Sequence, residues 1–335
     1  MLLQKQFDSV EQMNPFFAQV DGSLLQTGPG GNEWEITMAP LPSGGISHIK
    51  CCAPVTGLGA TREGDVCFLI PWQSREPHVF MGIDMSQDGF SAYGPRTSHV
   101  GRVKSESEIT MMLFSESRAL SSFETLAGSP GAASLKGFNA INPPPGSRQR
   151  LDDYLGKMLS SARGDATLLR HPSVIGEIEG RILQILCETM TGFGSHIQRP
   201  PLRCRNRAAV VKRSWDIIRA SQDSPVTLET LCRENNVSLR TLEYAFHEIA
   251  GMNPNVFLRI HRLHISQRAL VCGGARFVKE AAYAGGFFHL GRFSADYKMV
   301  FGESPLQTLH RVHGRKAGRP PAALAQNATP NSIFG

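Results

Sequence analysis

The spacing of hydrophobic positions along the chain changes near residue 146. Between residues 30 and 114, short runs of β-branched and aromatic residues alternate with Gly and Pro, which is typical of strands separated by turns. The runs that predict strands are residues 34–38, 46–55, 66–72, 78–83 and 109–114. Several short strands so close together favour a β-barrel or a sandwich, so residues 1–127 are expected to form a β-rich sensory or dimerisation domain.

Helical spacing begins after a Gly- and Pro-rich break at residues 127–145. Apolar side chains then recur every three or four residues in two stretches, 151–159 and 175–186. Residues 146–195 are therefore expected to hold two amphipathic linker helices, which either pack on the β-domain or form the seam of a dimer. A second linker, rich in Pro and Arg, follows at residues 198–203.

The next region opens with the pattern of a helix-turn-helix. Thr227 is placed to cap a first helix, and Asn236 tolerates the left-handed backbone of a tight turn. Ser238 then caps a second helix, on which Leu242 and Phe246 lie four residues apart and face inward. A helix, a short turn and a second helix with a free outer face form a motif that reads the major groove of DNA.

The same pattern recurs further along the chain. A third helix starts at Asn253-Pro254 and ends before Gly273-Gly274. After a short helix and a turn at Gly285-Gly286, a second reading helix is expected from about Leu290, with an inner stripe of Phe293, Tyr297 and Phe301. The two motifs, at about 228–249 and 278–301, would enter successive major-groove segments if their reading helices lie about 34 Å apart.

The residues of both motifs resemble the DNA-binding domain of AraC/XylS-type regulators. The first half is similar through Ser238, Arg240, Thr241, Leu242, Phe246, Gly251, Pro254, Leu258, Arg262 and Leu263. The second half is similar through Gly286, Phe287, Phe293, Tyr297, Lys298, Phe301, Gly302 and Pro305. The resemblance covers about residues 207–312 and implies DNA binding and control of transcription. The fuller stretch 286–297 resembles a subgroup that includes the ethanolamine-operon regulator.

Two sets of side chains are candidates for contact with DNA. Those expected to face the bases lie on the outer faces of the reading helices: Leu239, Arg240, Glu243, Tyr244, Gly291, Arg292 and Ala295. Those expected to hold phosphates and position the domain are Ser238, Thr241, His289, Ser294 and Lys298. Arg pairs with two acceptors of guanine, so Arg240 and Arg292 carry most of the expected base reading.

Charge is divided unevenly between the two halves of the chain. Residues 201–315 hold 17 Lys and Arg against 9 Asp and Glu, whereas residues 1–200 hold 16 against 20. A basic C-terminal domain behind a mildly acidic one is typical of a module that binds a polyanion such as double-stranded DNA. The Gly-, Pro- and Ala-rich residues 314–335 predict a disordered tail.

The rest of the sequence gives only weak signals for a catalytic, redox or metal-binding site. The seven cysteines form no Cys-x-x-Cys pair, which favours reduced thiols in a cytoplasmic protein over disulfides or a zinc site. Cys51-Cys52 is adjacent rather than spaced as a redox pair, and His48, His78 and His99 show no metal-ligand spacing. No catalytic residue, cofactor or metal is therefore expected, and no run of about 20 uncharged apolar residues predicts a membrane span.

The expected fold class is α+β, with a β-domain and linker helices ahead of an all-α domain with two helix-turn-helix motifs. The resemblance implies that the β-domain is cupin-like and senses a small molecule or dimerises. The expected partners are promoter DNA, a second copy of the chain, RNA polymerase and an effector, for an activator or a repressor. Two alternatives stay open: an N-terminal enzyme domain, or a ligand-free dimer platform, fused to the DNA-binding module.

Overall fold

The computed structural model describes residues 3–72, 76–164, 171–221 and 226–317. Its N-terminal part is built from two sheets whose strand pairs are all antiparallel. The larger sheet has the strand order β1 (Leu3–Phe7), β3 (Trp34–Leu41), β4 (Gly44–Cys51), β11 (Ser107–Ser115), β6 (Asp65–Pro71), β9 (Phe90–Tyr93), β12 (Phe138–Asn142), β13 (His196–Gln198). The smaller has the order β2 (Ser23–Gln26), β5 (Val55–Ala60), β10 (Ser98–Val103), β7 (Val79–Phe80), β8 (Ile83–Asp84).

The helices divide between the two halves of the chain. The N-terminal half holds α1 (Val10–Met13), the 3-10 helix η1 (Asn14–Val20), α2 (Glu116–Ala133), α3 (Gln149–Gly164) and α4 (Pro172–Thr191). The C-terminal half holds α5 (Leu202–Ala220), α6 (Leu228–Asn235), α7 (Leu239–Ala245), the π-helical segment η3 (Phe246–Ala250), α8 (Pro254–Val271), α9 (Val278–Ala284), α10 (Leu290–Phe301) and α11 (Pro305–Ala317). The expected α+β class is therefore confirmed.

The central strands of the larger sheet are buried on both faces. On β11, Ile109 and Met111 join the core between the two sheets, whereas Met112 and Phe114 join a second core beneath the helices. Successive side chains of a strand point to opposite faces, so a strand covered on both sides must be apolar at nearly every position. This explains the unbroken apolar runs that predicted strands in this part of the sequence.

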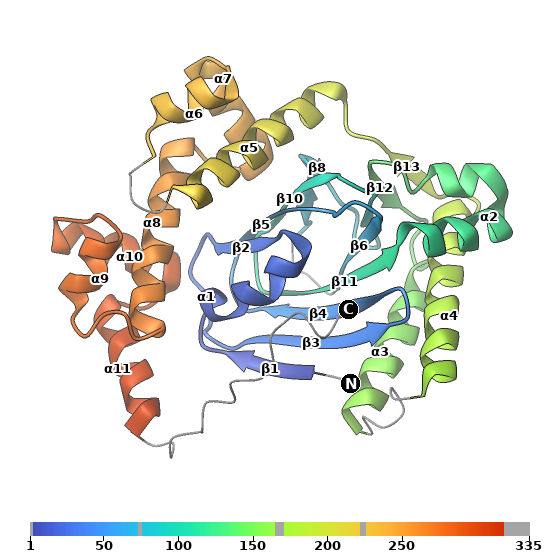
Figure 1. The fold of residues 1–335 in the computed structure, drawn as a ribbon, viewed down its shortest axis with the longest axis horizontal. Helices are drawn as coiled ribbons and strands as arrows, with labels where there is room; N and C mark the ends of the chain where they lie inside the picture. The colour runs from blue at the N-terminus through green and yellow to red at the C-terminus, as the bar shows by residue number, and fades with distance from the viewer. Residues whose placement is uncertain (1–2, 73–75, 165–170, 222–225, 318–335) are drawn as a thin grey trace.

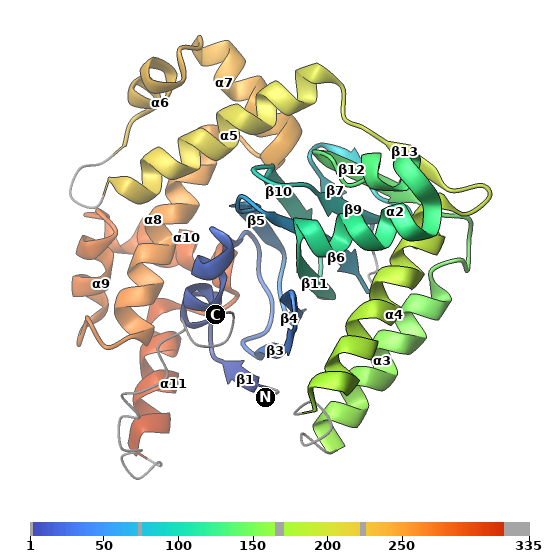
Figure 2. The same cartoon turned by 45° about the vertical axis from the view of Figure 1, so that its right-hand side comes forward.

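The two linker helices pack on the larger sheet. The apolar stripes of α3 and α4, including Leu155 and Ile182, lie in the second core together with Phe68 and Phe123. Of the two arrangements left open by the sequence, packing on the β-domain is observed within the chain, while Tyr154, Ile175 and Ile178 of these stripes stay partly exposed. In Figures 1 and 2, α3 and α4 lie on the side of the sheets away from the helical domain.

Several elements depart from the sequence-based expectations. The break expected at residues 127–145 contains the end of α2 and the strand β12, which pairs with β9. Helix α5 begins at the end of the expected linker 198–203, and α11 continues to Ala317, past the expected start of the tail at residue 314. The rest of that tail lies outside the described residues. Across the described ranges, no helix combines the length and the apolar character needed to cross a membrane.

Candidate nucleic-acid interface

The helical domain consists of two helix-turn-helix units joined by the long helix α8. Figures 1 and 2 show α6 and α7 beyond one end of α8, and α9, α10 and α11 toward the other. Asn253 caps α8, because its side-chain oxygen accepts from the Asn255 backbone N–H at 2.9 Å, and Pro254 occupies the first turn. The expected helix at this position is present and ends at Val271.

Side-chain caps shape the first unit as the sequence predicts. The Thr227 hydroxyl accepts from the Thr230 backbone N–H at 3.2 Å, and the Ser238 hydroxyl accepts from the Thr241 backbone N–H at 3.2 Å. Between these helices Asn236 adopts a left-handed backbone with φ of 52°. Leu242 and Phe246 are fully buried, so the opposite face of α7 is available to a partner.

The first set of candidate base-reading side chains lies on that outer face. Leu239, Arg240 and Tyr244 are exposed, and Glu243 is half-buried. The Arg240 guanidinium lies back along the helix, where Nη2 donates to the Tyr244 hydroxyl at 2.9 Å. The Arg207 guanidinium from α5 also lies over the Tyr244 ring, 5.6 Å from its centroid. Arg240 must therefore leave Tyr244 before it can reach a base edge.

The second unit is held by an arginine from α8. Arg262 Nε donates to the Gly285 carbonyl at 2.8 Å, Nη2 donates to the Gly286 carbonyl, and the guanidinium lies 4.5 Å from the Phe287 ring centroid. A side chain at Gly285 would collide with Ser266 and the Arg262 carbonyl, so the turn can approach α8 this closely only as glycine. The joining helix thus fixes where α10 begins.

The outer face of α10 carries the second set of candidates. His289, Gly291, Arg292, Ala295 and Lys298 are exposed, and Ser294 is half-buried. Phe293, Tyr297 and Phe301 form the buried stripe that the sequence predicts, and the Tyr297 hydroxyl pairs with the Thr308 hydroxyl at 3.0 Å. Among these side chains, Arg292 has the longest polar reach from the start of the helix.

Helix α5 is a part of the helical domain that the sequence analysis missed. It packs on α6, α7 and η3, and the Trp215 ring meets Phe257 of α8 at a centroid distance of 5.8 Å. The helical spacing of Ala208, Val211, Trp215 and Ile218, all buried, is the signal that could have revealed it. Helix α5 brings basic side chains to the first unit, among them Arg207, which pairs with Glu248.

The helical domain also rests on the β-domain. Helix α5 and η3 pack against β10, and α8 packs against α1 and β2. At the second of these contacts, Glu11 is buried between Nδ1 of His264 at 2.8 Å and Nε of Arg268 at 3.2 Å, and Nε2 of His264 faces the Gln26 carbonyl at 2.9 Å. The Gln26 amide in turn donates to the Val300 carbonyl of α10 at 3.1 Å.

The adjacent cysteines and His48, which the sequence analysis considered, show no sign of reactivity. Burial raises the pKa of Cys51 to about 12 and that of Cys52 to about 11, so neither is a thiolate at neutral pH. His48 pairs with Thr110 at 3.0 Å and Glu108 at 3.2 Å. Within the described ranges, no three His, Cys, Asp or Glu side chains gather in a way that would hold a metal ion.

Comparison with known proteins finds a helix-turn-helix family and several regulators of transcription. A family model described as a helix-turn-helix domain matches residues 231–311. The XylDLEGF operon transcriptional activator 1 of Pseudomonas putida is 30% identical over 169 residues, which are 49% of this chain and 48% of that protein. The probable thc operon regulatory protein of Rhodococcus erythropolis is 32% identical over 105 residues, which are 31% of this chain and 32% of that protein.

A solved structure also matches a part of the chain. It is described as a probable AraC family transcriptional regulator from Rhodopseudomonas palustris, is 33% identical, and is matched over 31% of this chain and 97% of its own length, with a TM-score of 0.30. This chain spans 32% to 48% of the length of the two relatives above. Because the family match falls on both motifs, the C-terminal region of this chain contains a helix-turn-helix domain, and the chain is similar in part to the regulators of transcription named above.

Proposed function

We propose that this chain is a sequence-specific DNA-binding regulator of transcription rather than an enzyme. The observation that carries the proposal is the pair of reading helices, α7 and α10, each buried on one face and open on the other. The net excess of eight basic residues in residues 201–315 supplies the attraction to phosphates that such a domain needs. Its place of action would be the cytoplasm, where promoter DNA and RNA polymerase are found in bacteria.

The base-facing and phosphate-facing roles of the candidate residues belong to this proposal. Arg240, Glu243 and Arg292 would read base edges, whereas Ser238 and Lys298 would hold phosphates. The relatives named as activators support activation as the direction of control. We also propose, from residues 286–297, that the chain is related to the subgroup that includes the ethanolamine-operon regulator.

A homodimer is the form we propose on DNA. Most of the apolar side chains of α3 and α4 are buried within one chain, so the contact between copies would rest mainly on other surfaces. Sedimentation of the full chain at micromolar concentration tests this part separately, and a single monomeric species with and without DNA would contradict it.

The β-domain offers a route by which an effector could act. An apolar cavity of about 70 Å³ lies between the two sheets, lined in part by Phe17, Val20 and Leu24. The same segment touches the DNA-binding domain, because Trp215 Nε1 donates to the Ser23 hydroxyl at 3.0 Å. Ligand sites usually enclose about 300–1,000 Å³, so the cavity would have to widen to admit an effector. Widening would move the two sheets apart and displace this segment.

Mapping of the sites bound by the full chain across a bacterial genome tests the proposed function. We expect discrete sites upstream of genes, lost when Arg240 and Arg292 are both replaced by Ala. Uniform occupancy, unchanged by these replacements, would show that the domain does not select sequence.

A further inference from the structure

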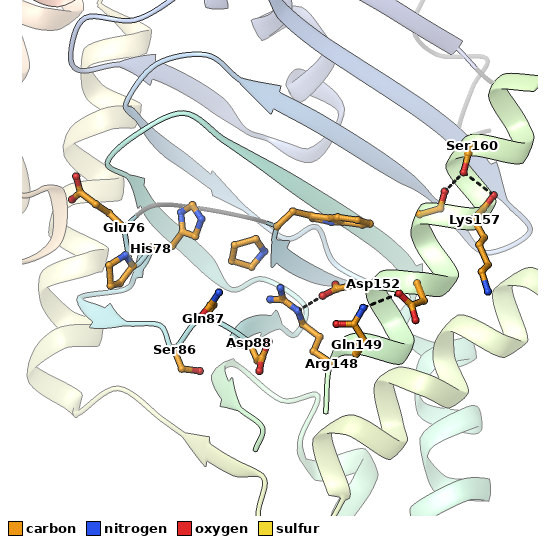
Figure 3. Close-up of a pocket in the computed structure, with 15 residues that line it drawn as sticks. Glu76, His78, Ser86, Gln87, Asp88, Arg148, Gln149, Asp152, Lys157 and Ser160 are labelled. Atoms are coloured by element: carbon orange, nitrogen blue, oxygen red, sulfur yellow. Dashed lines mark hydrogen bonds and ion pairs between the residues drawn. The ribbon is translucent and has the colours of Figure 1, made fainter. Parts of the chain in front are cut away.

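A second, larger groove lies on the side of the β-domain that carries α3. It encloses about 900 Å³ between the end of β6, the residues before β7 and the first three turns of α3. Figure 3 shows His78 on one side of this groove, with Arg148 and Asp152 across from it at the start of α3. The groove is separate from the apolar cavity between the sheets and from both reading helices.

The wall of the groove contains buried polar atoms that have no partner among the described residues. His78 is 4% exposed, and neither of its ring nitrogens has a hydrogen-bond partner. Asp152 Oδ2 accepts from Arg148 Nε at 3.1 Å, but Asp152 Oδ1 is buried and has no partner. Buried polar groups are nearly always hydrogen-bonded, so these atoms indicate a ligand that brings a donor to Asp152 Oδ1 and to one ring nitrogen of His78, whereas the other ring nitrogen is itself a donor.

The charge of the groove selects the kind of ligand. Arg148 is 4% exposed and pairs with Asp152, so the two charges cancel. Of the other described groups that line the groove, leaving Glu76 aside, Asp88 and Asp153 are acidic and Lys157 is basic. Burial and the Arg148 charge lower the pKa of His78 to about 4, so this ring stays neutral at pH 7 and accepts through one nitrogen. The groove therefore favours a cation over an anion.

We propose that this groove binds a small organic cation with N–H donors, such as an ammonium group on a short carbon chain. The ammonium would donate to Asp152 Oδ1 and to the acceptor nitrogen of His78. The indole of Trp72 also lines the groove, and its Nε1 donates to the Thr110 hydroxyl at 2.7 Å, which holds the ring in place. A fixed indole provides a face for the carbon chain or the cation.

Calorimetric titration of the full chain without DNA tests the proposal. Three four-carbon probes carry positive, zero and negative charge at pH 7: 1,4-diaminobutane, 1,4-butanediol and succinate. We expect the diamine to bind about tenfold or more tightly than the diol, and succinate to show no binding. Stronger binding of succinate, or no binding of any probe, would overturn the proposal.

Two variants locate the binding in the groove. Asp152→Asn should weaken binding of the diamine by about tenfold, because the charged acceptor is lost. Asp153→Asn, at an exposed position of the same groove, serves if Asp152→Asn does not fold, and should weaken binding in the same direction. Glu124→Gln also removes one negative charge, but from the exposed face of α2 outside the groove. This control should leave binding of the diamine unchanged. Equal affinity in the groove variants and this control would overturn the site.

No DNA takes part in these titrations. Failure of diamine binding would therefore leave the proposed reading of DNA untouched, and failure of the DNA-binding tests would leave this site untouched.

Discussion

Asn236 illustrates how single residues shape the reading surface. It sits between α6 and α7 with φ of 52°, a conformation that costs most residues about 1–2 kcal/mol but that Asn and Gly tolerate. The residue type alone was sufficient to predict a turn here. The partners of the Arg240 side chain were harder to predict, although its bond to Tyr244, four residues along the helix, follows helical spacing.

We predict that Asn236→Ala lowers the free energy of unfolding by about 1 kcal/mol, whereas Asn236→Gly leaves it nearly unchanged. Urea denaturation of the two variants measures the difference. Glu234→Ala, on the exposed face of α6, is the control and should stay within about 0.5 kcal/mol of the wild type. Equal losses from Ala and Gly would mean that backbone strain does not explain the choice of Asn.

Arg292 and Lys298 should separate base reading from phosphate binding. Arg292→Ala should cost about 1–3 kcal/mol on the cognate duplex and relax preference at one base position, and Arg240→Ala should behave alike. Lys298→Ala should weaken all duplexes to a similar extent and reduce the salt slope by about one. Anisotropy titrations on cognate and scrambled duplexes at several salt concentrations measure both effects. If Arg292→Ala lost affinity equally on both duplexes, its assignment as a base reader would be wrong.

His78 should make stability depend on pH. Its pKa is lowered from 6.5 to about 4 in the folded chain by burial and by Arg148, so the unfolded chain binds more protons between these two values. The folded state therefore keeps its full stability above pH 6.5 and loses up to about 1.4 kcal/mol per pH unit as the pH falls toward 4.

Urea denaturation of wild type and His78→Gln between pH 4 and pH 7 measures this contribution. The variant should show a shallower loss of stability on acidification, since it cannot take up the proton. Parallel curves for the two proteins would show that His78 titrates normally in the folded chain.

At the scale of elements, the sequence predicted those helices and strands whose pattern lies within a short stretch of neighbouring residues. The strands β6 and β11 and the helices α7 and α10 follow from runs and spacings within about a dozen residues. Among the elements that were missed, β12 has Gly and Pro on either side of its five residues, and the first turn of α5 overlaps the Pro-rich segment. Contacts such as Glu11 with His264, 253 residues apart, leave no signal in spacing.

That contact should contribute strongly to stability. Glu11 of α1 is buried against His264 and Arg268 of α8, so Glu11→Ala would leave the buried Nδ1 of His264 without a partner. We expect a loss of about 3 kcal/mol in the free energy of unfolding, since breaking a buried pair costs more than breaking an exposed one.

Denaturation of Glu11→Ala beside Glu63→Ala measures the contrast. Glu63 pairs with Arg96 at the surface, where both side chains are more than two-thirds exposed, and its loss should cost less than about 1 kcal/mol. Similar small losses in both variants would show that the α1–α8 contact does not hold the two domains together.

At the scale of the whole molecule, the β-domain supports both reading units at once. The segment from α1 to β2 contacts α8 and the end of α10, while β10 packs against α5 and η3 of the first unit. A rigid support of this kind would hold the two reading helices at a constant separation. Two reading helices held apart on one domain should recognise a site of two parts with a constant spacing, not two independent half-sites.

Selection of binding duplexes from a randomised library by the full chain tests this account most directly. We predict enrichment of a two-part site with centres about 10 base pairs apart, and a large loss of affinity when about five base pairs are inserted between the parts, since the second helix would then face the wrong side of the duplex. Arg240→Ala should relax one part, and Arg292→Ala the other. A selection that enriches no sequence, or a site indifferent to the insertion, would contradict the account of two coupled reading helices.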